Sequence, residues 1–225
     1  MDYKTILNES HILIGGTTGS GKSTTLQGII NTAINTYTPN VVKFLFIDLK
    51  RVELVEWKNI PHCLGYANDL DGAINLFKYA INRLESRFKD MEQKGLTETE
   101  YTHIFIVVDE LADLMQQAPK ITKELISKIG RLGRAAHIHL LLATQSPQRS
   151  CLDASIQQNI TCALALRCKT PIESRQVLGI KGAEKLPQYG LGIVWSSKGF
   201  EYMNLPYVSK EERQQSRERW KNWKN

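Results

Sequence analysis

The most restrictive feature of this 225-residue chain is a glycine-rich segment that reads G-x-x-x-x-G-K-S over residues 16–23. An apolar run at 11–15 precedes it, and apolar residues at helical spacing follow over 23–37. In this strand–loop–helix order, glycines let backbone N–H groups turn toward phosphates, and the helix N-terminus adds a partial positive charge. The segment therefore predicts a P-loop that binds a nucleoside triphosphate, and a glycine-rich turn without function is the weaker interpretation.

Each side chain of this loop has an expected role. Lys22 should reach the β- and γ-phosphates, Ser23 should offer its hydroxyl to Mg²⁺, and Thr24 should lie near the α-phosphate. ATP and Mg²⁺ are the expected cofactors. The residues expected to contact the nucleotide are Gly16, Thr17, Thr18, Gly19, Ser20, Gly21, Lys22, Ser23 and Thr24.

Polar side chains follow two other apolar runs. Asp109 and Glu110 come directly after the run at 103–108, where a doubly wound sheet places its ligands. We expect Asp109 to be a direct or indirect Mg²⁺ partner and Glu110 to be the general base that polarises the attacking water. Without a P-loop, such a pair would rather be a strand-end cap. Gln145 follows the run at 140–143, and its position leaves a sensor of the γ-phosphate and an ordinary polar strand end equally open.

The rest of the chain alternates apolar runs with helical patterns. Residues 11–15, 41–47, 103–108, 137–143 and 162–166 predict buried strands, and residues 23–37, 71–91, 120–135 and 174–178 predict helices, with a loop at 92–102. Residues 192–205 predict a β-hairpin. We expect an α/β fold with a mostly parallel sheet covered by helices on both faces. Residues 1–208 form the domain, and residues 209–225 form a charged, helical tail.

Composition narrows the cellular setting. The formal net charge of +6 favours an anionic partner, although a P-loop already binds polyphosphate. None of the four cysteines lies in a CxxC pair, which predicts reduced thiols of a cytoplasmic protein. The sequence contains no apolar run of membrane-spanning length and no basic segment followed by an apolar stretch at its start, so we expect neither membrane insertion nor a signal peptide.

Several stretches together resemble the FtsK/SpoIIIE family of ring-forming translocases, within the wider FtsK/HerA group of RecA-like motors. The stretches, in the family's order, are the P-loop, residues 47–54 (IDLKRVEL), 60–62 (IPH), 109–115 (DELADLM), 134–139 (RAAHIH), 143–147 (ATQSP), 173–175 (ESR) and 182–186 (GAEKL). The resemblance implies a RecA-like ATPase that works as a ring, expected to be a hexamer, and that moves double-stranded DNA. Compact relatives occur in conjugative elements, plasmids and phages, which suggests DNA transfer or mobile-element maintenance.

The resemblance also implies an arginine that completes the site of a neighbouring subunit. Arg134, at the end of the expected helix 120–135, matches that position best, and Arg175 is a second candidate for a nucleotide or subunit contact. Charge placement alone favours a different role for Arg134, because a cation at a helix C-terminus complements the helix dipole.

Three positions depart from the family pattern. Ser146, Gln157 and Ala163 stand where many DNA-translocating members carry basic residues near the pore, and Arg149 and Lys169 are the candidates to replace them. The missing cations support an alternative, a protein-translocating ATPase like those of type VII secretion, which residues 174–179 (SRQVLG) resemble equally well.

The two ends of the chain carry weaker signals. The start at Met1 and the basic tail favour a standalone protein over an excised domain. Trp220 and Trp223 in the tail either stack on bases or dock a helix on the domain, and docking is the favoured interpretation.

Overall fold

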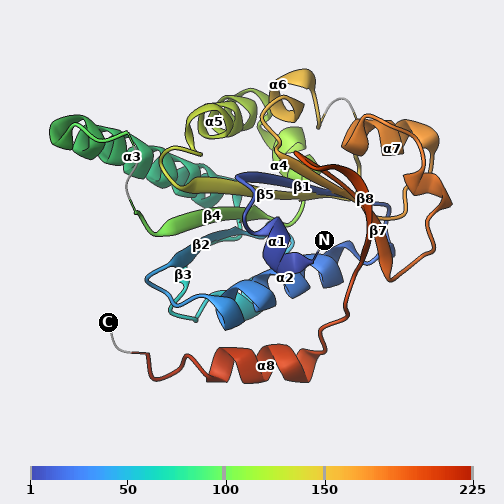
Figure 1. Cartoon of the computed structure of the whole chain (residues 1–225), viewed down its shortest axis with the longest axis horizontal. Coiled ribbons are helices and arrows are strands. Elements are labelled where there is room, and N and C mark those ends of the chain that lie inside the picture. The colour runs from blue at the N-terminus through green and yellow to red at the C-terminus, as the bar shows by residue number, and fades with distance from the viewer. Residues whose placement is uncertain (1, 98–99, 149–150, 224–225) are drawn as a thin grey trace.

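An eight-stranded sheet in the order β3-β2-β4-β5-β1-β6-β7-β8 is the centre of the computed structural model, which describes residues 2–97, 100–148 and 151–223 (Figure 1). The strands are β1 (His11–Gly15), β2 (Val42–Ile47), β3 (Cys63–Ala67), β4 (His103–Val108), β5 (Ile138–Thr144), β6 (Cys162–Ala165), β7 (Leu191–Ser196) and β8 (Gly199–Asn204). β1 to β6 are parallel, and β7 and β8 form an antiparallel hairpin at one end. The predicted α/β fold and its terminal hairpin are confirmed.

Helices cover both faces of this sheet, as the continuous apolar strands require. The helices are α1 (Tyr3–Ile6), α2 (Lys22–Thr36), α3 (Leu70–Lys94), α4 (Leu111–Gln117), α5 (Pro119–Leu132), α6 (Ala154–Gln157), α7 (Pro171–Leu178) and α8 (Lys210–Glu218), with short 3₁₀ turns η1 (Val55–Trp57) and η2 (Ala183–Lys185). In Figure 1, α1, α2 and α8 lie on one face, and α3 to α7 lie on the other.

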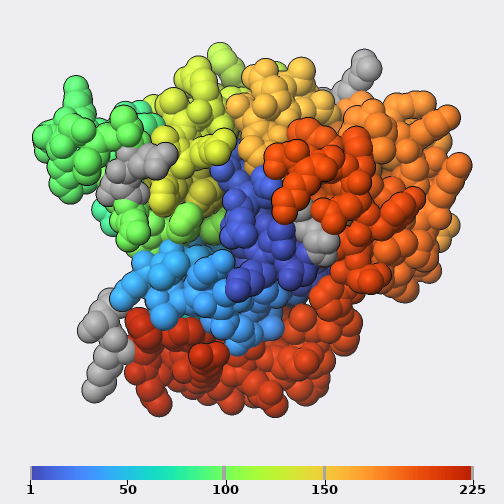
Figure 2. Space-filling view, in the orientation of Figure 1, coloured from blue at the N-terminus to red at the C-terminus, as the bar shows by residue number. Residues whose placement is uncertain are grey.

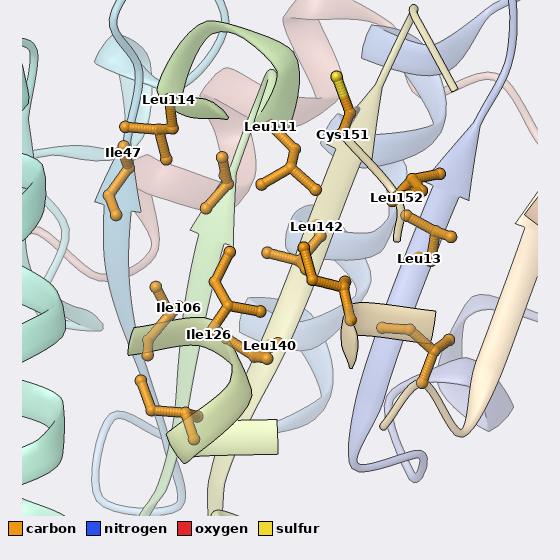
Figure 3. Close-up of a cluster of buried hydrophobic side chains, with 14 of the residues drawn as sticks. Leu13, Ile47, Ile106, Leu111, Leu114, Ile126, Leu140, Leu142, Cys151 and Leu152 are labelled. Atoms are coloured by element: carbon orange, nitrogen blue, oxygen red, sulfur yellow. The ribbon is translucent and has the colours of Figure 1, made fainter. Parts of the chain in front are cut away.

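Two buried clusters hold these layers together. Because strand side chains alternate between faces, Leu13 of β1 joins the cluster under α3, α4 and α5, whereas Ile12 and Ile14 join the cluster under α2. Figure 3 shows the first cluster, in which Leu111 and Leu114 of α4 lie with Ile47 of β2 and Leu142 of β5. This packing fixes α4 directly after the strand that carries the predicted catalytic acids.

The predicted helix over residues 120–135 is wrong at its C-terminal end. α5 ends at Leu132, and a turn leads into β5. Gly133 lies so close to the next strand that a Cβ there would be 2.2 Å from the carbonyl oxygen of Ile138. This close approach requires glycine and leaves Arg134 in the turn after the helix, not at the end of the helix.

Other boundaries differ in smaller ways. The predicted loop 92–102 is wrong over its first part, since α3 continues to Lys94 and ends at Gly95, whose φ is 63°. β3 and α4 were not predicted from the sequence. Among the described residues, no helix combines the length and the apolar character needed to cross a lipid bilayer.

The C-terminal tail packs on the domain beside α2. The ring nitrogen of Trp220 donates to the carbonyl of Ile34 at 2.9 Å, and its ring stands edge-on to His62 at 4.8 Å. Arg213 and Arg217 both pair with Glu56. Figure 2 shows the red tail against the blue N-terminal part of the molecule. Trp220 is 7% exposed, so in this structure it docks the tail and is not free to stack on bases.

We predict that Trp220→Ala destabilises the protein by about 3 kcal/mol, because truncating a buried tryptophan removes apolar contacts and leaves a cavity. Urea unfolding followed by circular dichroism measures the change. Tyr207→Ala is the matched control, since Tyr207 is 73% exposed and its truncation should cost less than about 0.5 kcal/mol. Equal stability of the two variants would contradict the docking role of Trp220.

Candidate nucleotide-binding site

The glycine-rich loop joins β1 to α2 and forms a cradle of backbone amides. Gly19 and Gly21 have φ angles of 77° and 92°, in the left-handed region that favours glycine. Gly21 caps α2 without any side-chain hydrogen bond, and the first turn of α2 holds no acid. The Ser20 hydroxyl is buried and has no hydrogen-bond partner among the described residues. A helix N-terminus that no side chain caps is suited to receive an anion.

Lys22 is buried at the start of α2, and its Nζ donates to the backbone carbonyl of Asp109 at 2.5 Å. Burial lowers its pKa, and the nearby carboxylates of Glu110, Asp109 and Glu53 oppose that shift. These acids favour the charged form of the buried ammonium group, next to the loop where the phosphates are expected.

Asp109 and Glu110 follow β4 at the same edge of the sheet. Burial raises the pKa of Asp109 to about 7, and the neighbouring Asp48 adds to the shift. The Glu110 carboxylate accepts hydrogen bonds from the Thr144 hydroxyl at 2.8 Å and from the Gln145 amide at 3.0 Å, and it caps α4 through the Ala112 amide at 3.4 Å. Glu110 therefore makes the contacts of a strand-end cap, and the same bonds orient its carboxylate at this edge of the sheet.

Gln145 connects Glu110 to the glycine-rich loop. β5 pairs with β1 so that Thr144 is opposite Gly15, which brings the next residue to the loop. The Thr18 hydroxyl donates to Gln145 Oε1 at 2.9 Å, while the Gln145 amide donates to Glu110. The expected location of Gln145 thus agrees with the structure, and its role as a sensor stays a prediction.

Sequence reasoning gave no role to several polar residues that converge on this edge. The Ser23 hydroxyl donates to Glu53 Oε1 at 2.6 Å, and Lys50 pairs with Asp113 at 3.3 Å. Both Lys50 and Glu53 follow β2, and strand-end position was the signal that could have found them. A cavity of about 330 Å³ over the loop is lined by Thr17, Thr18, Gly19, Ser20, Arg167, Cys168, Lys169, Glu184 and Gln188.

Neither candidate arginine lines the cavity over this loop. Arg134 precedes β5 and is exposed, so it lies at the opposite edge of the parallel sheet from the P-loop, which follows β1. It lines a separate cavity with Phe88, Arg131 and His137. Arg175 is exposed on α7 and lines another cavity together with Gln157 and Trp195.

The positions that bear on cargo binding have different surroundings. Gln157 donates from its side chain to the carbonyl of Gln176 at 2.8 Å, and Ser146 is exposed. Lys169 lines the cavity over the P-loop. Arg149 lies outside the described residues.

The oxygen atoms around Ser23 are of the kind that Mg²⁺ prefers. The described residues contain no cluster of three or more histidine, cysteine or acidic side chains that could hold a metal alone. Mg²⁺ usually takes one or two carboxylates and completes its shell with water and substrate phosphates. The Ser23 hydroxyl, with Glu53 beside it and Asp109 close to Lys22, fits such a shared site.

Comparison with known proteins gives consistent matches. The model of the FtsK/SpoIIIE family matches residues 1–103 and 97–149. The chain is 34% identical over 196 residues to the DNA translocase SpoIIIE of Bacillus subtilis (strain 168), which covers 78% of this chain and 25% of that protein. It is 32% identical over 204 residues to the DNA translocase FtsK of Tropheryma whipplei (strain TW08/27), a match that covers 81% of this chain and 28% of that protein. The chain thus spans about a quarter of the length of these curated relatives.

Solved structures share the fold. The pCW3 conjugation coupling protein TcpA, solved as a monomer with ATPγS, superposes with a TM-score of 0.81 at 23% identity, over 92% of this chain and 64% of that one. The cytoplasmic domain of the type VII secretion ATPase EccC of Thermomonospora curvata gives a TM-score of 0.77 at 27% identity, over 89% of this chain and 26% of that one. Both likenesses extend over most of the described sheet.

The raised pKa of Asp109 predicts how stability without nucleotide depends on pH. Between the usual pKa of 3.8 and about 7, the folded protein holds a proton that the unfolded chain has lost, so this group's contribution to stability falls as pH rises. Above pH 7 both states are ionised and the contribution levels off. The Asp109→Asn variant has no carboxyl that titrates at this position. Across this pH window the free energy of unfolding of the wild type should therefore fall by roughly 2–4 kcal/mol more than that of the variant, at about 1.4 kcal/mol per pKa unit.

Urea unfolding of the two proteins at a series of pH values, in EDTA and without nucleotide, measures this difference. The control is Asp71→Asn, which removes an exposed carboxylate. A stability difference between wild type and Asp109→Asn that stays constant with pH would show that Asp109 titrates normally.

Proposed function

Because this chain belongs to the FtsK/SpoIIIE family, we propose that it is an ATP-driven motor that assembles as a ring and moves double-stranded DNA. The observation that carries the proposal is the Glu110 carboxylate, held by the end of β5 at the same edge as Lys22 and the P-loop. A structural P-loop needs no oriented acid there, whereas hydrolysis does. The names of the relatives, all DNA translocases, and the net charge of +6 support DNA as the cargo.

The proposed chemistry assigns one task to each side chain. The amides of residues 16–24 and the Lys22 ammonium bind the phosphates, and Ser23 and Asp109 hold Mg²⁺. Mg²⁺ supplies charge neutralisation at the phosphate oxygens when bound. Glu110 accepts the proton of the attacking water. Gln145 couples the P-loop to Glu110, because a change at Thr18 on nucleotide binding is passed through Gln145 to the Glu110 carboxylate.

The position of Arg134 supports a site completed by a neighbouring subunit. β5 has seven residues, and at about 3.3 Å per residue roughly 20 Å separates Arg134 from the edge that carries Glu110. An arginine side chain spans about a third of that distance, so Arg134 cannot reach the P-loop of its own subunit. Arg134 instead stabilises the transition-state charge in the next subunit of a ring. Arg175 is the second candidate for a subunit contact.

Further parts of the proposal concern assembly and setting. Six subunits form the ring, which works in the cytoplasm. Residues 1–208 form the motor domain, and residues 209–225 form a tail that docks on it. DNA transfer or maintenance of a mobile element is the proposed biological role.

A polypeptide cargo is the second candidate. It is favoured by the 27% identity to the EccC cytoplasmic domain and by Ser146, Gln157 and Ala163, which leave three expected pore cations absent. The two candidates use the same hydrolytic site and differ in what stimulates it.

Long duplex DNA should raise the ATPase rate several-fold, because cargo in the pore orders the ring. The stimulation should fall steeply between about 50 and 200 mM salt, since phosphate contacts release counterions. A coupled phosphate-release assay measures the rate. Glu110→Gln should bind ATP and hydrolyse it at least about 100-fold more slowly, which is the control for a contaminating ATPase. Hydrolysis by an assembled ring that DNA leaves unchanged at low salt would contradict the DNA proposal and favour polypeptide cargo.

Mixing two inactive variants should restore part of the activity. Arg134→Ala keeps its own Lys22 and Glu110, and Lys22→Ala keeps its Arg134, so mixed rings contain complete sites at some interfaces. Each variant alone should lose at least about 100-fold in rate, given what an arginine finger contributes. Arg131→Ala, which removes an exposed cation from the same cavity, should retain activity. Variants that co-assemble without regaining activity would show that Arg134 does not act on a neighbour.

A further inference from the structure

The loop that follows β2 is folded so that it brings Glu53 to the first turn of α2. The Asp48 carboxylate accepts the amides of Val52 at 3.2 Å and Leu54 at 2.9 Å. Arg51 within the loop has a φ of 61°, in the left-handed region. Asp48 is fully buried, so the loop has one anchored conformation, and Glu53 lies between the two bonded amides.

The backbone of Glu53 has a second anchor on α2 itself. Its carbonyl accepts a hydrogen bond from the side-chain amide of Gln27. Gln27 in turn accepts from the ring nitrogen of Trp57 at 2.5 Å, and Trp57 is fully buried. Three side chains, those of Asp48, Gln27 and Trp57, therefore anchor the backbone at Glu53 beside the first turn of α2.

The carboxylate so positioned bonds to the hydroxyl that is the proposed metal ligand. Glu53 Oε1 accepts from Ser23 Oγ at 2.6 Å, and its charge is among those that oppose the lowering of the Lys22 pKa by burial. ATP carries several negative charges, and a carboxylate beside its phosphates repels it unless a cation lies between them. With a divalent cation present, the same carboxylate becomes an attractive oxygen neighbour.

We propose that Glu53 makes nucleotide binding depend on a divalent cation: it occupies Ser23 and repels the phosphates without the metal, and it belongs to the metal's oxygen environment when Mg²⁺ and nucleotide are bound. This inference rests on the proposed function, since it concerns the same P-loop. Glu53 is then a third side chain that offers oxygen to the metal, beside Ser23 and Asp109. Its carboxylate lets the site distinguish free nucleotide from the magnesium–nucleotide complex.

Calorimetric titration with ATPγS, once with Mg²⁺ and once with EDTA, tests the proposal. The dissociation constant of ATPγS in EDTA, divided by its dissociation constant with Mg²⁺, measures how strongly binding depends on the metal. In Glu53→Gln, ATPγS should bind more weakly with Mg²⁺ and more tightly in EDTA, so that the ratio falls at least about tenfold. Opposite changes in the two buffers are the signature of a charge at the metal site, which a merely structural brace would not produce.

Three further variants make the test sharp. Glu53→Ala removes the same charge, so its ratio of dissociation constants should fall in the same way, and it replaces Glu53→Gln in the test if that variant does not fold. Glu53→Asp keeps the charge and should keep the ratio within about threefold of wild type. Glu85→Gln removes a distant carboxylate that pairs with Lys128 and should leave the ratio unchanged.

The outcomes separate the two proposals. A folded Glu53→Gln protein with an unchanged ratio, or with equal weakening in both buffers, overturns the role of Glu53 and leaves the motor proposal intact. Failure of wild type to bind ATPγS with Mg²⁺ overturns the motor proposal itself.

Discussion

The arrangement of this site depends on one geometric constraint, which is that β1 to β6 are parallel and end at the same edge of the sheet. Each strand end delivers a different group to that edge. β1 delivers the P-loop, β2 the loop of Glu53, β4 the Asp109–Glu110 pair, and β5 Gln145. In the register between β1 and β5, Gly15 is opposite Thr144, so segments more than 120 positions apart in sequence meet at this edge.

The same edge concentrates charge that is costly to bury. Lys22, Asp48, Asp109 and Glu110 are all at most 4% exposed, and an unpaired buried charge would be expensive. The opposing signs reduce this cost, as the influence of the acids on the pKa of Lys22 shows. The balance nevertheless leaves Asp109 with a raised pKa beside a second carboxylate. A cation placed among these acids would relieve their repulsion, so this P-loop site is better matched to a metal–nucleotide complex than to either component alone.

The sequence was informative wherever one local signal decided the structure. The glycine pattern located the P-loop, and the continuous apolar runs located five of the six parallel strands. β3 escaped prediction because Cys63–Ala67 contains a glycine and is only partly buried, so that neither apolar continuity nor alternation marks it. Glu53 was given no role because its position after β2 indicates only the edge of the sheet at which it lies. Its hydrogen bond to Ser23, thirty positions away, cannot be seen in a single-sequence pattern. The end of α5 was misjudged because the contact of Gly133 with Ile138 is tertiary.

The two edges of the sheet have unequal roles in the proposed ring. The carboxyl edge carries phosphate cradle, acids and Gln145, whereas Arg134 lies at the amino edge, in a turn that Arg87 of α3 helps to fix by donating to the carbonyls of Ala136 and Thr102. If Arg134 acts on a neighbour as proposed, a single subunit holds two halves of a catalytic site at opposite edges of its sheet. Closing the site requires the amino edge of one subunit to approach the carboxyl edge of the next. In this proposal, nucleotide binding at one edge changes the subunit interface and hydrolysis reverses that change, so that ATP turnover moves cargo through the ring.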